Sequence, residues 1–244
     1  GPALVALALY FLSRDGAGPL GLNPRAAPRW YAAALAFYPL VAVIAVALGV
    51  AAGAARLTLD ARYLAAFGAV FAVQLIKNPI EEFIFRGYGT RTAVALGLPG
   101  AATPHLLVGA VWALWHLPLY LVWTSAADLR LVSSLSRPLF LPLLLLGLMA
   151  ASLVYGELRV RTGSIWPGVL LHSMANAIVT PLIVEGGLTF DGHADVLFSP
   201  VAASVVTTLL FAAAGVLLLR GRRTPAATSP PAPAARRETH RSIS

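Results

Sequence analysis

The chain has 244 residues, of which 58% are hydrophobic and 11% are charged, and its formal net charge is +8. A soluble domain usually has about twice that charged fraction, so part of this surface must face lipid. Six arginines lie in the tail after residue 219, so the rest of the chain has no basic face of the kind that would indicate nucleic-acid binding. The absence of cysteine excludes disulfides, thiolate metal sites and a cysteine nucleophile.

Seven apolar stretches follow one another along the chain. The first, at 3–12, is too short to cross a bilayer and is expected to be a span whose beginning is missing. The other six are 30–54, 63–85, 103–123, 138–155, 165–184 and 197–219. A helix needs about 20 apolar residues to cross a bilayer, and lipid cannot satisfy an open backbone. We therefore expect an all-α transmembrane bundle with about seven spans here and room for an eighth in the full-length protein.

Charged residues between the spans predict the orientation. The loops at 13–29 and 159–161 and the segment after Phe85 are basic, whereas 185–196 holds three acidic residues and no Lys or Arg. The positive-inside rule then places the basic loops and the C-terminus in the cytoplasm. With one lysine against 17 arginines and many alanines, the composition favours a bacterial source, and so a bacterial cytoplasmic membrane. We divide the chain into a membrane domain, 1–219, and a basic disordered tail, 220–244, which would contact membrane lipid.

The first polar motif within a span is Glu81-Glu82-x-x-x-Arg86. Glu82 and Arg86 are four residues apart on a helix, with the acid first, which favours an ion pair. Glu81 would then have no local countercharge, and a carboxylate in a poorly solvated site suits a general base. The alternative is a charged cluster that extends to the membrane surface at a helix end.

Two further motifs lie in other spans. His116 follows Trp112 by one helical turn, and His172 and Asn176 share one helix face. Either histidine alone could be explained by a hydrogen bond between helices, and His105, which fits no motif, is assigned a structural role. Acids, two histidines and an amide on three spans are together sufficient to activate water and stabilise an oxyanion.

These three motifs, in this order and over about 70–180, resemble the signature of the CPBP family (CAAX protease and bacteriocin-processing). The family includes the Ras-converting prenyl endopeptidase. The resemblance implies a helical bundle whose water-accessible cavity opens toward the cytoplasm, and an endopeptidase acting on a membrane-associated protein or peptide that can be lipidated. It also implies a protease-like core at about 70–180. The family more often has Phe at the position of Trp112, a difference that would alter only local pocket shape.

The resemblance also implies a role for each motif residue. Glu81 would activate the attacking water with His116 near it, and His172 and Asn176 would position the water or hold the oxyanion. Glu82 and Arg86 would pair and support them.

Three alternatives stay open. The chain lacks a His-Glu-x-x-His motif, so we favour a mechanism without a cofactor, although zinc held by Glu81, His116 and His172 is chemically feasible. The protein could instead be a non-catalytic immunity or scaffold protein of the same fold. A proton-coupled transporter would also use buried Glu and His, but we find no convincing internal repeat.

Overall fold

The computed structural model describes residues 2–13 and 17–221, so the predicted disordered tail lies almost entirely outside it. The main helices are α1 (Pro2–Ser13), α2 (Pro28–Ala51), α3 (Ala61–Glu82), α5 (Thr103–Pro118), α7 (Arg137–Thr162), α8 (Trp166–Val184) and α10 (Val205–Arg220). Two π-helical segments, η1 (Phe83–Thr90) and η2 (Leu119–Trp123), continue α3 and α5, and α4 (Arg91–Ala95), α6 (Ala126–Val132) and α9 (Asp195–Phe198) are short. The all-α prediction is confirmed.

Five helical stretches are long and apolar enough to cross a membrane: Pro28–Ala51, Ala61–Ala95, Thr103–Trp123, Arg137–Thr162 and Trp166–Val184. They confirm a bundle of transmembrane helices and match five of the predicted spans. Shorter apolar helices, α1 and α10, occupy the two remaining positions.

The stretch predicted as one span at 197–219 is interrupted. Helix α9 ends at Phe198, and α10 begins only at Val205. Pro200 has no backbone N–H to continue a helix, and two hydroxyls bond to backbone oxygens around the break: Ser204 Oγ donates to Leu197 O (3.0 Å) and Thr207 Oγ1 to Ser199 O (2.9 Å).

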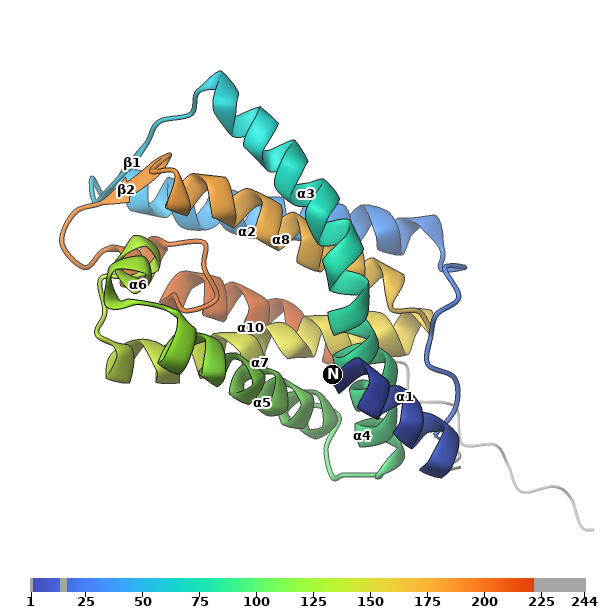
Figure 1. Ribbon diagram of the computed structural model, residues 1–244. Coiled ribbons are helices and arrows are strands. Elements are labelled where there is room, and N and C mark those ends of the chain that lie inside the picture. The colour runs from blue at the N-terminus through green and yellow to red at the C-terminus, as the bar shows by residue number, and fades with distance from the viewer. Residues whose placement is uncertain (1, 14–16, 222–244) are drawn as a thin grey trace, which may run out of the picture.

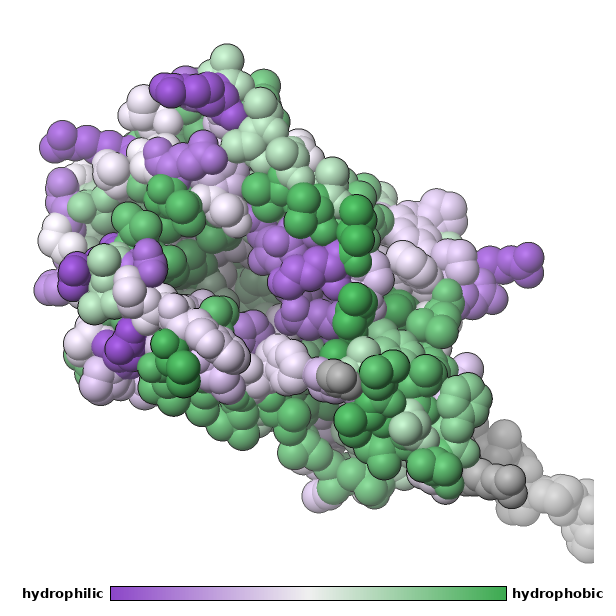
Figure 2. Space-filling view, viewed as in Figure 1, coloured by the Kyte–Doolittle hydropathy of each residue, from purple (hydrophilic) through white to green (hydrophobic). Residues whose placement is uncertain are grey.

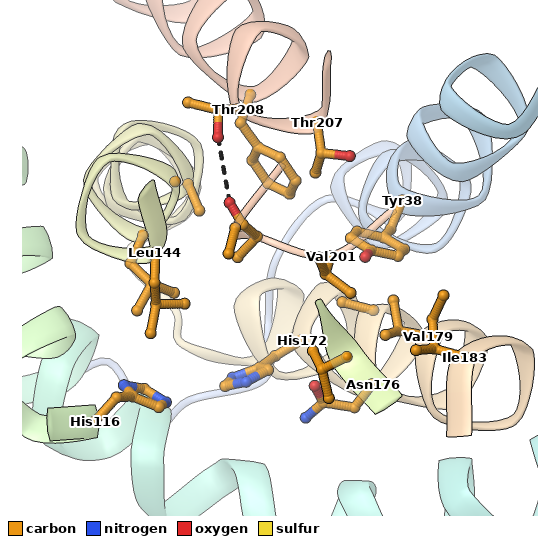
Figure 3. A pocket seen from close by; sticks show the side chains of 18 of the residues that line it. Tyr38, His116, Leu144, His172, Asn176, Val179, Ile183, Val201, Thr207 and Thr208 are labelled. Carbon is orange, nitrogen blue, oxygen red and sulfur yellow. Dashed lines mark hydrogen bonds between the residues drawn. The ribbon is translucent and has the colours of Figure 1, made fainter. Parts of the chain in front are cut away.

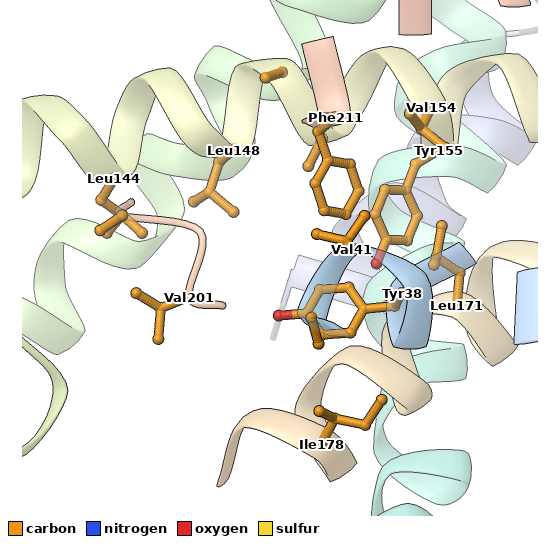
Figure 4. Close-up of a cluster of buried hydrophobic side chains, with 14 of the residues drawn as sticks. Tyr38, Val41, Leu144, Leu148, Val154, Tyr155, Leu171, Ile178, Val201 and Phe211 are labelled. Carbon is orange, nitrogen blue, oxygen red and sulfur yellow. The ribbon is translucent and has the colours of Figure 1, made fainter. Parts of the chain in front are cut away.

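The bundle has two groups of helices (Figure 1). Helix α8 packs against α2 and α3, and α7 packs against α5 and α10. Side chains from both groups meet in the core shown in Figure 4, where Tyr38 of α2 lies near Phe211 of α10 with ring centroids 6.1 Å apart. Glycines allow close approach, as expected between membrane helices. A Cβ at Gly109 would lie only 2.8 Å from the Cα of Met149.

A short antiparallel pair of strands, β1 (Ala55–Leu57) and β2 (Leu188–Phe190), lies near α6 in Figure 1. It joins the end of α2 to the end of α8, and Arg56 faces Thr189. No strand was expected, because three residues are too few to show a recognisable alternation.

Basic side chains hold the loop between α1 and α2. Arg91 Nη1 donates to Gly18 O at 2.9 Å, and Arg159 Nη2 donates to Pro19 O at 2.6 Å. Gly21, with φ +77°, lies against the Arg159 guanidinium, where a Cβ would come within 2.6 Å. Arg161 bonds to Leu218 O near the end of α10. These arginines therefore link the loop, α7 and α10.

Candidate active site

A row of polar side chains joins α3 to α8. Their hydrogen bonds pair Gln74 with Asn176 (3.1 Å), Asn78 with Ser173 (3.3 Å) and Glu82 with His172 (3.0 Å). The members from α3 are four residues apart, so they share one face of that helix. As the residue numbers of the pairs rise along α3 from 74 to 82, those of their partners on α8 fall from 176 to 172, so the two helices are antiparallel here. We call these three pairs the polar ladder. It brings the first and third sequence motifs into contact.

Glu82 orients His172. Its side chain is fully buried, and its Oε1 lies 3.0 Å from Nδ1 of His172. Because an ionised carboxylate can only accept, Nδ1 carries the proton and Nε2 of a neutral ring keeps its lone pair. Gly168 lies against the same carboxylate, where a Cβ would come within 2.9 Å of Oε2.

Arg86 neutralises Glu82 from inside the protein. Nη1 lies 3.4 Å from Oε1 of Glu82, so the ion pair expected from their spacing is present. The guanidinium lies 4.0 Å from the ring centroid of Trp112 and 4.5 Å from that of Tyr155. Aromatic faces attract such a cation strongly when water is excluded, and the Arg86 side chain is only 1% exposed.

Glu81 has two partners, so the expectation that it lacks a local countercharge is wrong. Lys77 Nζ lies 3.7 Å from Oε2, and the indole Nε1 of Trp112 donates to Oε1 at 2.7 Å. The four-residue spacing that pairs Glu82 with a later arginine also pairs Glu81 with an earlier lysine. Phenylalanine, which the family more often has at the position of Trp112, has no N–H that could bond to Glu81. Trp112 thus alters a contact of Glu81 as well as the local pocket shape.

Trp112 brings the predicted residues together. Its ring lies edge-on to His116 (centroids 5.9 Å apart) and to His172 (5.6 Å), while its N–H bonds to Glu81. Nδ1 of His116 donates to Trp112 O at 2.8 Å, which leaves Nε2 as the acceptor of a neutral ring. Asn176 lies one helical turn beyond His172, where it donates to Gln74.

Two cavities adjoin this cluster. The inner cavity, about 290 Å³, lies between the two groups of helices, with His116, His172 and Asn176 along one side and Thr207 and Thr208 across from them (Figure 3). The rest of its lining is mostly apolar and aromatic.

The second cavity, which we call the flank groove, has a volume of about 460 Å³. It is lined by residues of α1, α3, η1, α5 and η2, among them Glu81, Lys77 and His116. Figure 2 shows hydrophilic side chains near the centre of this face, beside a hollow that lies between the two groups of helices, with hydrophobic residues around them. His116 borders both cavities.

Several site residues were missed by the sequence analysis. Gln74 and Asn78 could have been found, because they continue the face of Glu82 backward at four-residue steps within an apolar helix. Tyr155, which covers Arg86 from α7, had no such signal. His105 lies elsewhere, fully buried, and its Nε2 donates to Glu157 of α7 at 3.0 Å.

The residues considered for zinc do not form a ligand set in the part of the chain that the structure describes. No three His, Asp or Glu side chains within 2–13 and 17–221 converge on a point where an ion could be held. Nδ1 of His172 is bonded to Glu82, and the Glu81 oxygens contact Trp112 and Lys77.

Comparison with curated proteins gives no match. A family model described as type II CAAX prenyl endopeptidase Rce1-like matches residues 63–178. This range contains all three motifs. Residues 63–178 are therefore similar to the Rce1-like type II CAAX prenyl endopeptidases, and this match supports the predicted resemblance to the CPBP family.

Proposed function

We propose that this protein is an intramembrane endopeptidase that hydrolyses a peptide bond of a membrane-associated protein or peptide with water activated by Glu81. The observation that carries the proposal is that Glu81, His116 and His172 all contact Trp112, beside two cavities that are both lined by His116. Glu81 lines the flank groove and His172 lines the inner cavity, so we expect the scissile carbonyl and the attacking water to bind beside His116, which lines both.

In this mechanism Glu81 takes a proton from water as the oxygen attacks the scissile carbonyl carbon. The proton later passes to the leaving amine nitrogen, so the peptide bond breaks into a carboxylic acid and an amine. His116 lies near the attacking water. His172 and Asn176 position the water or hold the oxyanion, for which an amide N–H is a suitable donor.

Glu82 and Arg86 support this reaction without touching the substrate. The Glu82 carboxylate holds the ring of His172, and Arg86 balances the charge of Glu82 beneath Trp112. We propose that the mechanism uses no metal, because Glu81 can accept the proton itself.

We further propose a domain organisation of a membrane domain, 1–219, and a basic tail, 220–244. The protein would lie in a bacterial cytoplasmic membrane with its C-terminus in the cytoplasm. The grouping of Arg91 and Arg159 on the 18–19 backbone, and of Arg161 on the end of α10, supports this orientation. The tail would contact lipid headgroups.

Glu81→Gln tests the proposal, and Glu185→Gln, at an exposed loop carboxylate, is the matched control. Peptides released from membranes with each variant would be compared by mass spectrometry. We expect Glu81→Gln to remove wild-type products, a loss of about 100-fold or more, with normal expression and folding, while Glu185→Gln retains them. Unchanged cleavage by Glu81→Gln would overturn the protease proposal and favour a non-catalytic immunity or scaffold role. Substrate-driven proton movement in liposomes would favour a transporter.

A further inference from the structure

Among the described residues that line the flank groove, which are mostly apolar, Lys77 is the one cation. Seven of the groove's ten lining residues are apolar: Pro2, Ala3, Leu4, Ile80, Ile84, Trp115 and Leu119. The other three are Glu81, His116 and Lys77. Lys77 is also the only lysine in the 244-residue sequence. A single ammonium group beside the proposed general base is therefore the feature to explain.

The Lys77 side chain is much more exposed than that of Arg86, the cation paired with Glu82. Arg86 is enclosed by two aromatic rings and is 1% exposed, whereas the Lys77 side chain is 59% exposed. The distance of 3.7 Å from Nζ to Oε2 of Glu81 is an ion-pair contact, longer than a hydrogen bond. An ammonium group has three N–H donors. Lys77 can thus bind a second anion without leaving Glu81.

A negatively charged substrate group would otherwise be repelled here. Glu81 must be ionised to act as a base, and a second carboxylate nearby is unfavourable without a cation between them. Lysines in membrane helices often extend their ammonium to the interface. Lys77 instead faces the groove that holds Glu81 and His116. Its position suits an anion that arrives together with the scissile bond.

We propose that Lys77 binds a carboxylate of the peptide substrate on the leaving-group side and so determines where the chain is cut. This inference rests on the proposed function. Every unmodified peptide has a carboxylate at its C-terminus, and an Asp or Glu side chain offers the same chemistry. Extended chain advances about 3.3 Å per residue. A carboxylate on Lys77, next to Glu81, therefore lies within a few residues of the scissile bond.

The test uses three versions of one cleaved peptide: the free C-terminal acid, the C-terminal amide, and the amide with glutamate as the last residue. Each is supplied to the full chain in lipid vesicles as wild type, Lys77→Gln, Lys77→Arg or Arg62→Gln. Arg62 is the matched control, because it is an exposed cation of the same helix, ion-paired with Asp60 at 2.9 Å. The readout is the kcat/KM for the acid divided by the kcat/KM for the amide, measured within each variant. A direct effect of Lys77 on Glu81 changes both values equally, so it cancels in this ratio.

For wild type we expect the acid to be cleaved about tenfold or more faster than the amide, as for a hydrogen bond to a charged group. Lys77→Gln should bring this ratio close to one, while Lys77→Arg and Arg62→Gln retain it. Rescue by the glutamate-ending amide would assign the preference to any nearby carboxylate, and no rescue would assign it to the terminus.

Two results would overturn the inference while leaving the proposed function intact: wild type that cleaves acid and amide equally, or Lys77→Gln that keeps the wild-type ratio. If Lys77→Gln does not fold, Lys77→Met serves as the second uncharged variant, and a wild-type ratio in that variant would equally overturn the inference. Cleavage that persists in Glu81→Gln would instead mean that the proposed function itself has failed.

Discussion

One oxygen of Glu82 serves two partners: Oε1 lies 3.0 Å from Nδ1 of His172 and 3.4 Å from Nη1 of Arg86. The three side chains come from α3, η1 and α8, and none of them is more than 9% exposed. This carboxylate thus couples the position of a proposed catalytic histidine to a buried charge. Its removal should affect both stability and rate.

Glu82→Ala should destabilise the protein by about 3–5 kcal/mol, because it leaves the Arg86 charge buried without its anion. Glu82→Gln should destabilise it less, since the amide oxygen can still accept from His172, but cleavage should slow. Unfolding in detergent micelles and peptide cleavage would measure the two effects. Glu185→Ala is the control for loss of an exposed carboxylate. Wild-type stability of Glu82→Ala would contradict the buried pair.

Trp112→Phe should lower the cleavage rate by about tenfold, the value of one hydrogen bond to a charged group. Because Trp112 is buried, the smaller ring should also lower the unfolding temperature, so rates are compared at a temperature where both proteins are folded. Trp123→Phe, at an exposed position of η2, should behave as wild type. Full activity of Trp112→Phe would mean that the bond to Glu81 at 2.7 Å is not needed.

Gln74→Leu should reduce cleavage severalfold by releasing the amide of Asn176, and Asn176→Ala should reduce it more. If Gln74 acts through Asn176, the double variant should be no slower than Asn176→Ala alone. Cleavage rates of wild type, the two single variants and the double variant with one peptide would complete this double-mutant cycle. Additive losses would show that Gln74 acts independently of Asn176.

Treatment with EDTA or 1,10-phenanthroline should leave cleavage unchanged, because Glu81 is proposed to accept the proton without a metal. Rates before and after chelation, and after zinc is added back, would test this. Loss on chelation that zinc reverses would instead support a zinc site at Glu81, His116 and His172.

Gly109→Ala should destabilise the bundle by about 1–3 kcal/mol, as expected for overpacking. Its Cβ would meet the Cα of Met149 and the Cβ of Ser152, both at 2.8 Å. Gly68→Ala is the matched control, because no atom of the described residues lies within 4 Å of its added Cβ. It should be neutral or slightly stabilising, since alanine favours helix. Equal stability of the two variants would contradict the close packing of α5 on α7.

Local spacing predicted much of this molecule. Apolar length identified the five long spans, and the four-residue step identified the Glu82–Arg86 pair. The same step would have found Lys77 beside Glu81 had it been applied toward the N-terminus.

Contacts between helices could not be predicted in the same way. That His172 bonds to Glu82, or that Trp112 bonds to Glu81, depends on how α5 and α8 rotate against α3, and one sequence contains no measure of that rotation. The π-helical segments η1 and η2 were also missed, because they change the rotation per residue without a change in apolar character.

The flank groove opens between α1, α3 and α5, and exposed apolar side chains such as Ile76, Leu114 and Trp115 lie on the same helices. A membrane-associated substrate of the proposed kind would reach this groove by diffusing in two dimensions within the bilayer. Its encounter rate with Glu81 then depends on its mole fraction among the lipids. If vesicles that hold fixed amounts of enzyme and substrate were fused with vesicles of lipid alone, the substrate would be diluted within the bilayer and cleavage would slow. An increase in the aqueous volume around the vesicles would not slow it.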